Sequence, residues 1–130
     1  MKNIPANYQD LLADECKAFL YLATTMSDGT PQVTPVWFNA DENHILVNTA
    51  AGRVKDINMQ ERPFIALAIQ APDDPYRYIQ IRGKVVGRTT EGADAHINAL
   101  SLKYRGRSWS GSADETRVIY KISADKVDAH

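Results

Sequence analysis

The chain has 130 residues, and its 15 Lys and Arg residues against 16 Asp and Glu residues give a formal net charge of −1. This length suits a single domain, predicted over residues 1–130, and is too short for two. The even charge balance argues against a nucleic-acid partner, which requires excess positive charge. No apolar run reaches the roughly 20 residues that span a bilayer, so no membrane partner is expected either. Residues 1–5 show no signal-peptide pattern, and we therefore expect a cytoplasmic protein.

The first half of the chain predicts one short helix and three strands. An amphipathic helix is expected from Pro5 to about Lys17. The segments 19–25, 32–38 and 45–49 are rich in aromatic and β-branched residues, which is typical of strands. Short polar turns separate them and favour antiparallel pairing.

The second half predicts helices over 53–61 and 91–103 and strands over 64–70, 78–89 and 117–122. Val54 and Ile57, together with Met59 or Asn58, are expected to face inward from the first of these helices, and Thr90 is expected to cap the second. Gly83 and Gly87 interrupt a long strand, which predicts bends or bulges. The polar stretch over 105–115 is expected to form a loop.

Six strands, three helices and hairpin-length connections do not fit a doubly wound parallel sheet. We therefore predict a mainly β fold, in which six antiparallel strands curl into a barrel with short helices at its margins. Because six strands enclose little volume, side chains should fill the interior. Any ligand should then lie outside the barrel or between subunits.

Two cations at a predicted helix start carry the strongest functional signal. Arg53 and Lys55 lie in a first helical turn, where unpaired N–H groups and the helix dipole normally favour acidic residues. Breaking a local rule in this way is expected at functional sites. A phosphate group could bind there, with donors from the helix start, the Thr49 hydroxyl and both cations. The alternative is that the cations are solvated or pair with Asp56 and Glu61.

The sequence offers few other catalytic signatures. His44, His96 and His130 show no metal-ligand spacing, so no metal site is predicted. No nucleophile elbow and no glycine-rich phosphate loop occurs. A redox cofactor that carries its own chemistry would need only a shaped site and a phosphate anchor. Trp37 should face away from its strand neighbour Phe38, where it could border a flat ring or pack against a second subunit.

Several short motifs occur along the chain in an order and spacing that, taken together, are specific. They are Leu22-Ala23-Thr24-Thr25, the stretches 28–33 and 35–38, the strand 45–49 with the basic residues after it, residues 76–85, and the segments 91–97 and 117–122. Together, over roughly residues 5–128, they resemble the pyridoxamine 5′-phosphate oxidase-like split β-barrel proteins. The likeness is to the small branch described as coenzyme F420-dependent.

The resemblance implies a homodimer with FMN- or F420-type cofactor sites at the subunit interface. It places the phosphate at Arg53 and Lys55 and the adjoining strand end at Asn48, Thr49 and Ala50. The strand that lies against the tricyclic ring corresponds to Pro35, Val36 and Trp37. Gln80 and Arg82 fall on a strand that approaches the site from the same chain or from the partner chain. The chain is much shorter than true pyridoxamine 5′-phosphate oxidases and does not show their carboxyl-terminal substrate-binding segment. Vitamin B6 oxidation is therefore only a further alternative.

The resemblance implies an oxidoreductase that passes a hydride between F420, with FMN as the alternative, and a small organic substrate. The basic residues Lys103, Arg105 and Arg107 could receive the acidic tail of F420, although a solvated loop explains them more simply. A second hypothesis is a cofactor carrier without turnover. A third is a dimeric module without ligand, whose cations pair with carboxylates. The loop over 105–115 carries no signature that identifies a substrate.

Overall fold

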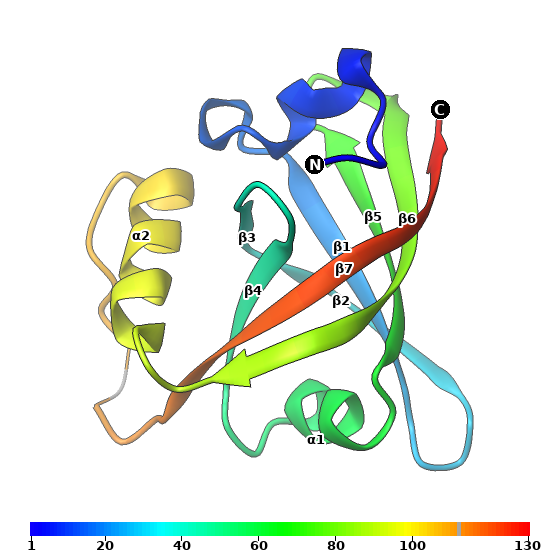
Figure 1. The fold of residues 1–130 in the computed structure, drawn as a ribbon. Helices are drawn as coiled ribbons and strands as arrows, with labels where there is room; N and C mark the ends of the chain where they lie inside the picture. The colour runs from blue at the N-terminus through cyan, green and yellow to red at the C-terminus, as the bar shows by residue number, and fades with distance from the viewer. Residues whose placement is uncertain (112) are drawn as a thin grey trace.

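The computed structural model describes residues 1–111 and 113–130, so the expected loop over 105–115 includes one position, 112, outside the described residues. Within that part, seven strands form one antiparallel sheet that curls into an open barrel (Figure 1). The strands are β1 (Phe19–Thr25), β2 (Pro31–Val36), β3 (Phe38–Ala40), β4 (Ile45–Ala50), β5 (Phe64–Ala71), β6 (Asp74–Thr89) and β7 (Arg117–Ala129). Their order in the sheet is β2-β1-β5-β6-β7-β4-β3.

The mainly β, antiparallel fold is confirmed, with one strand more than predicted. The expected strand over 32–38 changes partner at Trp37: β2 pairs with β1, whereas β3 pairs with β4. Pro31 and Pro35 lack the N–H group that an interior strand must donate, so β2 suits an edge of the sheet. The two edge strands are thus joined through a single residue, a junction that we call the Trp37 junction.

The long strands β6 and β7 form the middle of the sheet and carry its curvature. Their pairing shifts register between Arg82 and Gly83 and between Val85 and Gly87, so both glycines lie at the predicted irregularities. A Cβ atom at Gly83 would lie 1.8 Å from the backbone oxygen of Ser123, which leaves room only for glycine. The antiparallel pairing expected for the first three segments is confirmed between β1 and β2 and between β3 and β4, and β4 also pairs with β7.

Short helices lie at the margins of the barrel (Figure 1). They are the 3-10 helices η1 (Ala6–Leu12) and η2 (Asp14–Cys16) and the α-helices α1 (Val54–Glu61) and α2 (Ala93–Arg105). The single helix expected from Pro5 to Lys17 is wrong, because Ala13 is extended, with φ −73° and ψ 142°, and separates two tighter turns. Gly92, not Thr90, precedes the first residue of α2.

The inward face of α1 agrees with the prediction only in part. Val54 and Ile57 are each 45% exposed, whereas Met59 and Asn58 are buried as expected, together with Asp56. The helix is oriented by polar anchors: Asn58 Nδ2 donates to the Thr24 hydroxyl at 3.1 Å, and Asp56 contacts the sheet as described below. Apolar spacing therefore predicted the existence of this helix but only part of its inward face.

Side chains fill the interior of the barrel, as expected for so narrow a sheet. Fully buried members of this core include Leu20, Leu22, Phe38, Ile45, Ile69, Ile79, Ile81, Tyr120 and Ile122. The hollows that could receive a ligand consequently lie on the outside. None of the described helices is long and apolar enough to cross a membrane.

Candidate functional site

A cleft of about 420 Å³ lies beside the Trp37 junction, between the start of α1 and the end of α2. We call it the basic cleft. Its lining residues are Phe19, Leu20, Pro35, Val36, Trp37, Asn48, Thr49, Arg53, Lys55, Ile97, Arg105, Trp109 and Arg117. Seven of the ten predicted site residues are therefore brought together here, although they come from three separate segments of the chain.

Four cations among the described residues line this cleft. Arg53 and Lys55 come from the start of α1, Arg105 from the end of α2 and Arg117 from the start of β7. The carboxylate of Glu115 bridges two of them, with Oε1 3.0 Å from Arg53 Nη2 and Oε2 2.9 Å from Arg117 Nη1. These two guanidinium groups lower the pKa of Glu115. The cleft is thus positive even with this carboxylate in place.

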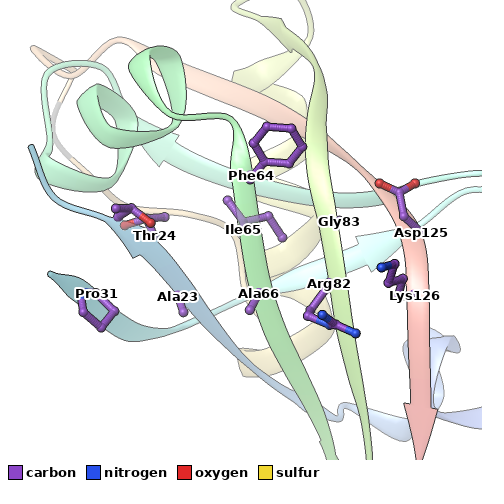
Figure 2. Close-up of a pocket in the computed structure, with 11 residues that line it drawn as sticks. Ala23, Thr24, Pro31, Phe64, Ile65, Ala66, Arg82, Gly83, Asp125 and Lys126 are labelled. Carbon is purple, nitrogen blue, oxygen red and sulfur yellow. The ribbon is translucent and has the colours of Figure 1, made fainter. Parts of the chain in front are cut away.

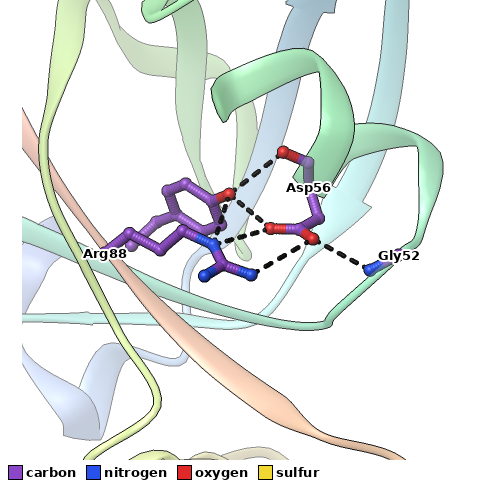
Figure 3. A network of polar contacts seen from close by, with 4 residues as sticks. Gly52, Asp56 and Arg88 are labelled. Carbon is purple, nitrogen blue, oxygen red and sulfur yellow. Dashed lines mark hydrogen bonds and ion pairs between the residues drawn. The ribbon is translucent and has the colours of Figure 1, made fainter. Parts of the chain in front are cut away.

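The acids expected to neutralise Arg53 and Lys55 have other partners. Asp56 is buried under α1, where its carboxylate accepts hydrogen bonds from Gly52 N at 2.8 Å, from Arg88 Nε at 3.0 Å and from the Tyr120 hydroxyl (Figure 3). Burial opposes ionisation of Asp56, but the hydrogen bonds from Arg88, Tyr120 and Gly52 outweigh it and lower the pKa of this carboxyl. Asp56 therefore fixes the first turn of α1 to the sheet.

Lys55 remains without an acidic partner within the described part of the chain, since Glu61 pairs with Arg62 at 2.9 Å. Its side chain is half-buried. Burial and the positive charges of Arg53 and Arg117 lower the pKa of Lys55. A ligand anion would relieve both the desolvation and the repulsion, which is the arrangement expected of an anion site.

A hydrogen-bonded chain holds Arg117 in place. Its Nε donates to Asn48 Oδ1 at 2.9 Å, and Asn48 Nδ2 lies 3.0 Å from His96 Nδ1 and 2.9 Å from the Ala93 carbonyl oxygen. On the other side of the ring, His96 Nε2 lies 2.8 Å from Asn39 Oδ1. Burial lowers the pKa of His96 to about 4, so the ring is neutral at pH 7. The partners assign the proton to Nε2 and leave Nδ1 as an acceptor.

Thr49 supplies an independent sign of a ligand. The residue is 3% exposed and lines the basic cleft, yet its hydroxyl has no hydrogen-bond partner among the described residues. Buried hydroxyl groups normally have a partner, because leaving one unsatisfied costs about 1–3 kcal/mol. A phosphate oxygen would accept this hydrogen bond, so the donor set fits a phosphorylated ligand.

Aromatic side chains, Trp37 and Trp109 among them, also line the cleft. The Trp37 ring stacks on Tyr104, with centroids 5.6 Å apart and planes at 11°, and meets Trp109 edge-on at 5.9 Å. The guanidinium of Arg105 lies 5.2 Å from the Trp37 ring centroid, and that of Arg117 lies 5.3 Å from the Trp109 centroid. Such a wall suits a flat conjugated ring.

Three predicted site residues lie elsewhere. Ala50 is buried at the end of β4, where its carbonyl oxygen accepts a hydrogen bond from Arg53 N at 3.2 Å. Gln80 and Arg82 are exposed on the outer face of β6 and do not line the basic cleft. Within one chain, the structure does not bring these two side chains to the others.

Arg82 instead lines a second hollow of about 490 Å³ on the outer face of the sheet, which we call the outer groove (Figure 2). Its lining residues are Ala23, Thr24, Thr25, Pro31, Phe64, Ile65, Ala66, Arg82, Gly83, Asp125 and Lys126. The outer groove shares no lining residue with the basic cleft and is slightly larger. The cluster of cations and the unpartnered hydroxyl nevertheless lie at the basic cleft, which makes that cleft the candidate site.

Sequence reasoning missed Arg117 and Glu115 as site residues, whereas Trp109 was one of the aromatic residues considered for a pocket mouth, and it lines the cleft. On β7 the core-facing positions alternate through Val118 and Tyr120, so Arg117 falls on the outward face, where a charged residue is ordinary. Only the pairing of β4 with β7, which is a long-range contact, could have placed Arg117 beside Asn48.

Comparisons with known proteins agree with this architecture. The sequence profile of the family described as pyridoxamine 5′-phosphate oxidase matches residues 4–130. A solved F420 reductase superposes with a TM-score of 0.85 at 32% identity, covering 96% of this chain and 98% of that one. No curated protein matches the chain in sequence.

More distant structures share the fold. A conserved hypothetical protein from Mycobacterium tuberculosis gives a TM-score of 0.74 at 17% identity, covering 99% of this chain and 87% of that one. HupZ from Group A Streptococcus gives 0.65 at 19% identity, covering 97% and 93%. At these identities the likeness concerns the fold alone.

Proposed function

The chain belongs to the pyridoxamine 5′-phosphate oxidase family, and from this premise we propose that it is an oxidoreductase that binds a phosphorylated deazaflavin or flavin in the basic cleft. F420 is the first choice of cofactor and FMN the alternative, because a solved F420 reductase is 32% identical in sequence to this chain. The observation that carries the proposal is the buried, unpartnered Thr49 hydroxyl beside the cations of the cleft.

The residues present fit such a group. Arg53, Lys55 and Thr49 would hold the phosphate, and the aromatic wall at Trp37 with the adjoining backbone of Pro35 would orient the flat ring. When bound, either cofactor supplies hydride transfer at its ring. The protein's own part is to bind, to orient and to keep water from the reacting face.

The same cleft favours a second candidate, a cofactor carrier without turnover. Among its described lining residues there is no His, Asp, Glu or Cys, which leaves Lys55 as the one described side chain there suited to proton transfer, and the phosphate site proposed above would engage that ammonium. Reduced F420 or FMN bound to the protein should be mixed with a panel of enones, quinones and tetrapyrroles. Oxidation of the cofactor faster than in free solution supports the oxidoreductase, and no acceleration across the panel supports the carrier.

We also propose that two copies of the chain associate through the outer groove. Phe64 is 72% exposed at this groove, and Val33, on the neighbouring edge strand β2, is 65% exposed. Apolar surface of this kind on a sheet is typical of an interaction site. Association would also give Gln80 and Arg82, which face outward on β6, a route to a site in the partner chain.

The binding proposal is tested by titrating purified protein with F420 and with FMN. Replacing Lys55 by Ala removes a cation that has no competing acid, so affinity should fall about 10- to 150-fold, equivalent to about 1.5–3 kcal/mol for a charged hydrogen bond. Arg53→Ala should also weaken binding, by less, because Glu115 already engages Arg53.

The matched control is Lys2→Ala, which removes an exposed cation at the amino terminus and should leave affinity unchanged. The proposal is rejected if neither cofactor binds, or if both cleft variants bind as tightly as the parent chain. The cofactor that binds more tightly identifies which of the two the protein uses.

A further inference from the structure

Glu115 does not line the basic cleft itself but contacts two of the arginines that do. Its two carboxylate oxygens are divided between two arginines from different elements, Arg53 at 3.0 Å and Arg117 at 2.9 Å. Arg117 is 8% exposed, so its charge is largely removed from water and requires an anion nearby. Glu115, which lies two residues before Arg117 in the chain, supplies that anion.

This carboxylate satisfies only part of the donor set. The Lys55 ammonium and the Thr49 hydroxyl line the same cleft, and neither has an anionic partner among the described residues. A single carboxylate has two oxygens, and both of those of Glu115 are engaged by the arginines. A phosphate group has more oxygens and up to two charges, so it could engage the arginines, the lysine and the hydroxyl together.

Resting on the function proposed above, we propose that Glu115 is an internal counter-ion that competes with the ligand's phosphate for Arg53 and Arg117 and leaves them when the phosphate binds. The Glu115 side chain is 28% exposed, so it has access to solvent when it is displaced. It immediately precedes Thr116 and β7, in a segment outside the strands and helices, which leaves it free of ladder constraints.

The exchange makes Glu115 a determinant of specificity for the charge of the ligand. A ligand carboxylate would replace one bridging carboxylate by another and gain little. A phosphate monoester such as that of FMN has up to two charges and gains the additional contacts with Lys55 and Thr49, which offset the loss of the internal ion pairs, whereas a singly charged phosphate diester such as that of F420 gains less. The cleft should therefore prefer phosphorylated ligands to carboxylates of similar shape.

The experiment compares the parent chain with Glu115→Gln in titrations with FMN, riboflavin, F420 and inorganic pyrophosphate. Glutamine keeps the shape and an acceptor oxygen for Arg117 but removes the competing charge. We expect FMN, F420 and pyrophosphate to bind about three- to tenfold more tightly, corresponding to one or two partly exposed ion pairs. Riboflavin, which has the FMN ring without the phosphate, should bind equally to both.

Two controls accompany it. Glu42→Gln makes the same change in net charge in the exposed turn before β4 and should leave every affinity unchanged. Glu115→Ala, together with the urea unfolding midpoint of each variant, shows whether an altered affinity comes from altered folding. If Glu115→Gln is less stable, a gain in phosphate affinity in Glu115→Ala still supports the proposal.

The outcomes separate this inference from the function on which it rests. If cofactors bind the parent chain but Glu115→Gln binds them equally or more weakly, Glu115 positions the arginines and the counter-ion role is overturned, while the cofactor site stands. If no cofactor binds either protein, the proposed function fails. Pyrophosphate then decides alone: tighter binding by Glu115→Gln supports the counter-ion role, and equal, weaker or no binding overturns it.

Discussion

His96 acts on the basic cleft without lining it. Its neutral ring accepts from Asn48 and donates to Asn39, and Asn48 in turn accepts from Arg117. This chain fixes the direction of the Arg117 guanidinium by hydrogen bonds among uncharged groups. Both nitrogen atoms of the His96 ring are engaged, and Asn48 donates to the unprotonated one. Protonating the ring would therefore remove the acceptor that Asn48 needs.

The burial of His96 predicts a pH dependence of stability. Its pKa in the folded protein is about 4, below the ordinary value of 6.5, so between these values the unfolded chain binds a proton that the folded chain does not. The part of the unfolding free energy that depends on this neutral ring is therefore complete above pH 6.5 and is lost as the pH falls toward 4. We expect His96→Gln to flatten the fall of the urea unfolding free energy between pH 6.5 and pH 4.5.

An NMR titration of the ring provides the second measurement. The His96 signals should remain those of the neutral ring down to about pH 5. The description would be contradicted if the His96 ring titrated at the ordinary value of 6.5. It would also be contradicted if His96→Gln left the pH dependence of the unfolding free energy unchanged.

Single residues of the candidate site were predictable where they broke a local rule. Arg53 and Lys55 at a helix start were such residues, and Thr49 lies four residues before Arg53, near the end of the preceding strand. Arg117 broke no rule, because a charge on the outward face of a strand is ordinary. Its burial arises from packing between β7, β4 and α2, and no property of residues 117–122 contains that information.

Among the elements, β6 and β7 depend on a close approach at Gly83. The register shift there brings the Ser123 carbonyl to a place where any Cβ atom would overlap it. Gly83→Ala should lower the unfolding free energy by about 3 kcal/mol, because the backbone must move in the middle of the sheet. Urea unfolding followed by circular dichroism measures the change.

Gly87 offers a matched control in the same strand. A Cβ atom at Gly87 would lie 3.4 Å from the Lys121 side chain, which is flexible, so Gly87→Ala should cost less than about 1 kcal/mol. Equal losses in the two variants would contradict the assignment of the sensitivity to the Ser123 carbonyl.

The elements also show where sequence patterns suffice. The strand β1 was predicted with its observed bounds, because a stretch rich in apolar, aromatic and β-branched residues lies between two polar segments. The inward face of α1 was predicted only in part, since Val54 and Ile57 are exposed and Asp56 faces inward beside Asn58 to reach partners on β6, β7 and β1. Buried polar anchors override apolar spacing, and their partners lie far away in the sequence.

For the whole molecule, the outer groove predicts association. Phe64 places 72% of its surface in solvent at this groove, and we expect the parent chain to sediment as a dimer. Phe64→Glu should shift the population toward monomer in sedimentation velocity, because it would bury charge at the contact.

Tyr76→Glu is the control for that measurement. Tyr76 is 86% exposed but does not line the outer groove, so its replacement should leave the dimer intact. A parent chain that sediments as a monomer, or equal effects of both variants, would place the contact elsewhere or remove it.

The fold class could be predicted because short alternating strands and hairpin-length turns leave few arrangements. The number of strands could not, because the change of partner at Trp37 occurs without a turn signal in the sequence. The separation of Gln80 and Arg82 from the seven residues of the basic cleft depended on the curl of the sheet, which bulges at Gly83 and Gly87 help to set.

The position of Trp37 gives the protein a built-in optical probe. Trp37 and Trp109 are the chain's two tryptophans, and their rings meet edge-on at the basic cleft. All indole emission therefore originates from one wall of one cavity, and a coloured ring arriving there would quench it by energy transfer. A plain fluorescence titration of the unlabelled protein thus reports directly on occupancy of that wall.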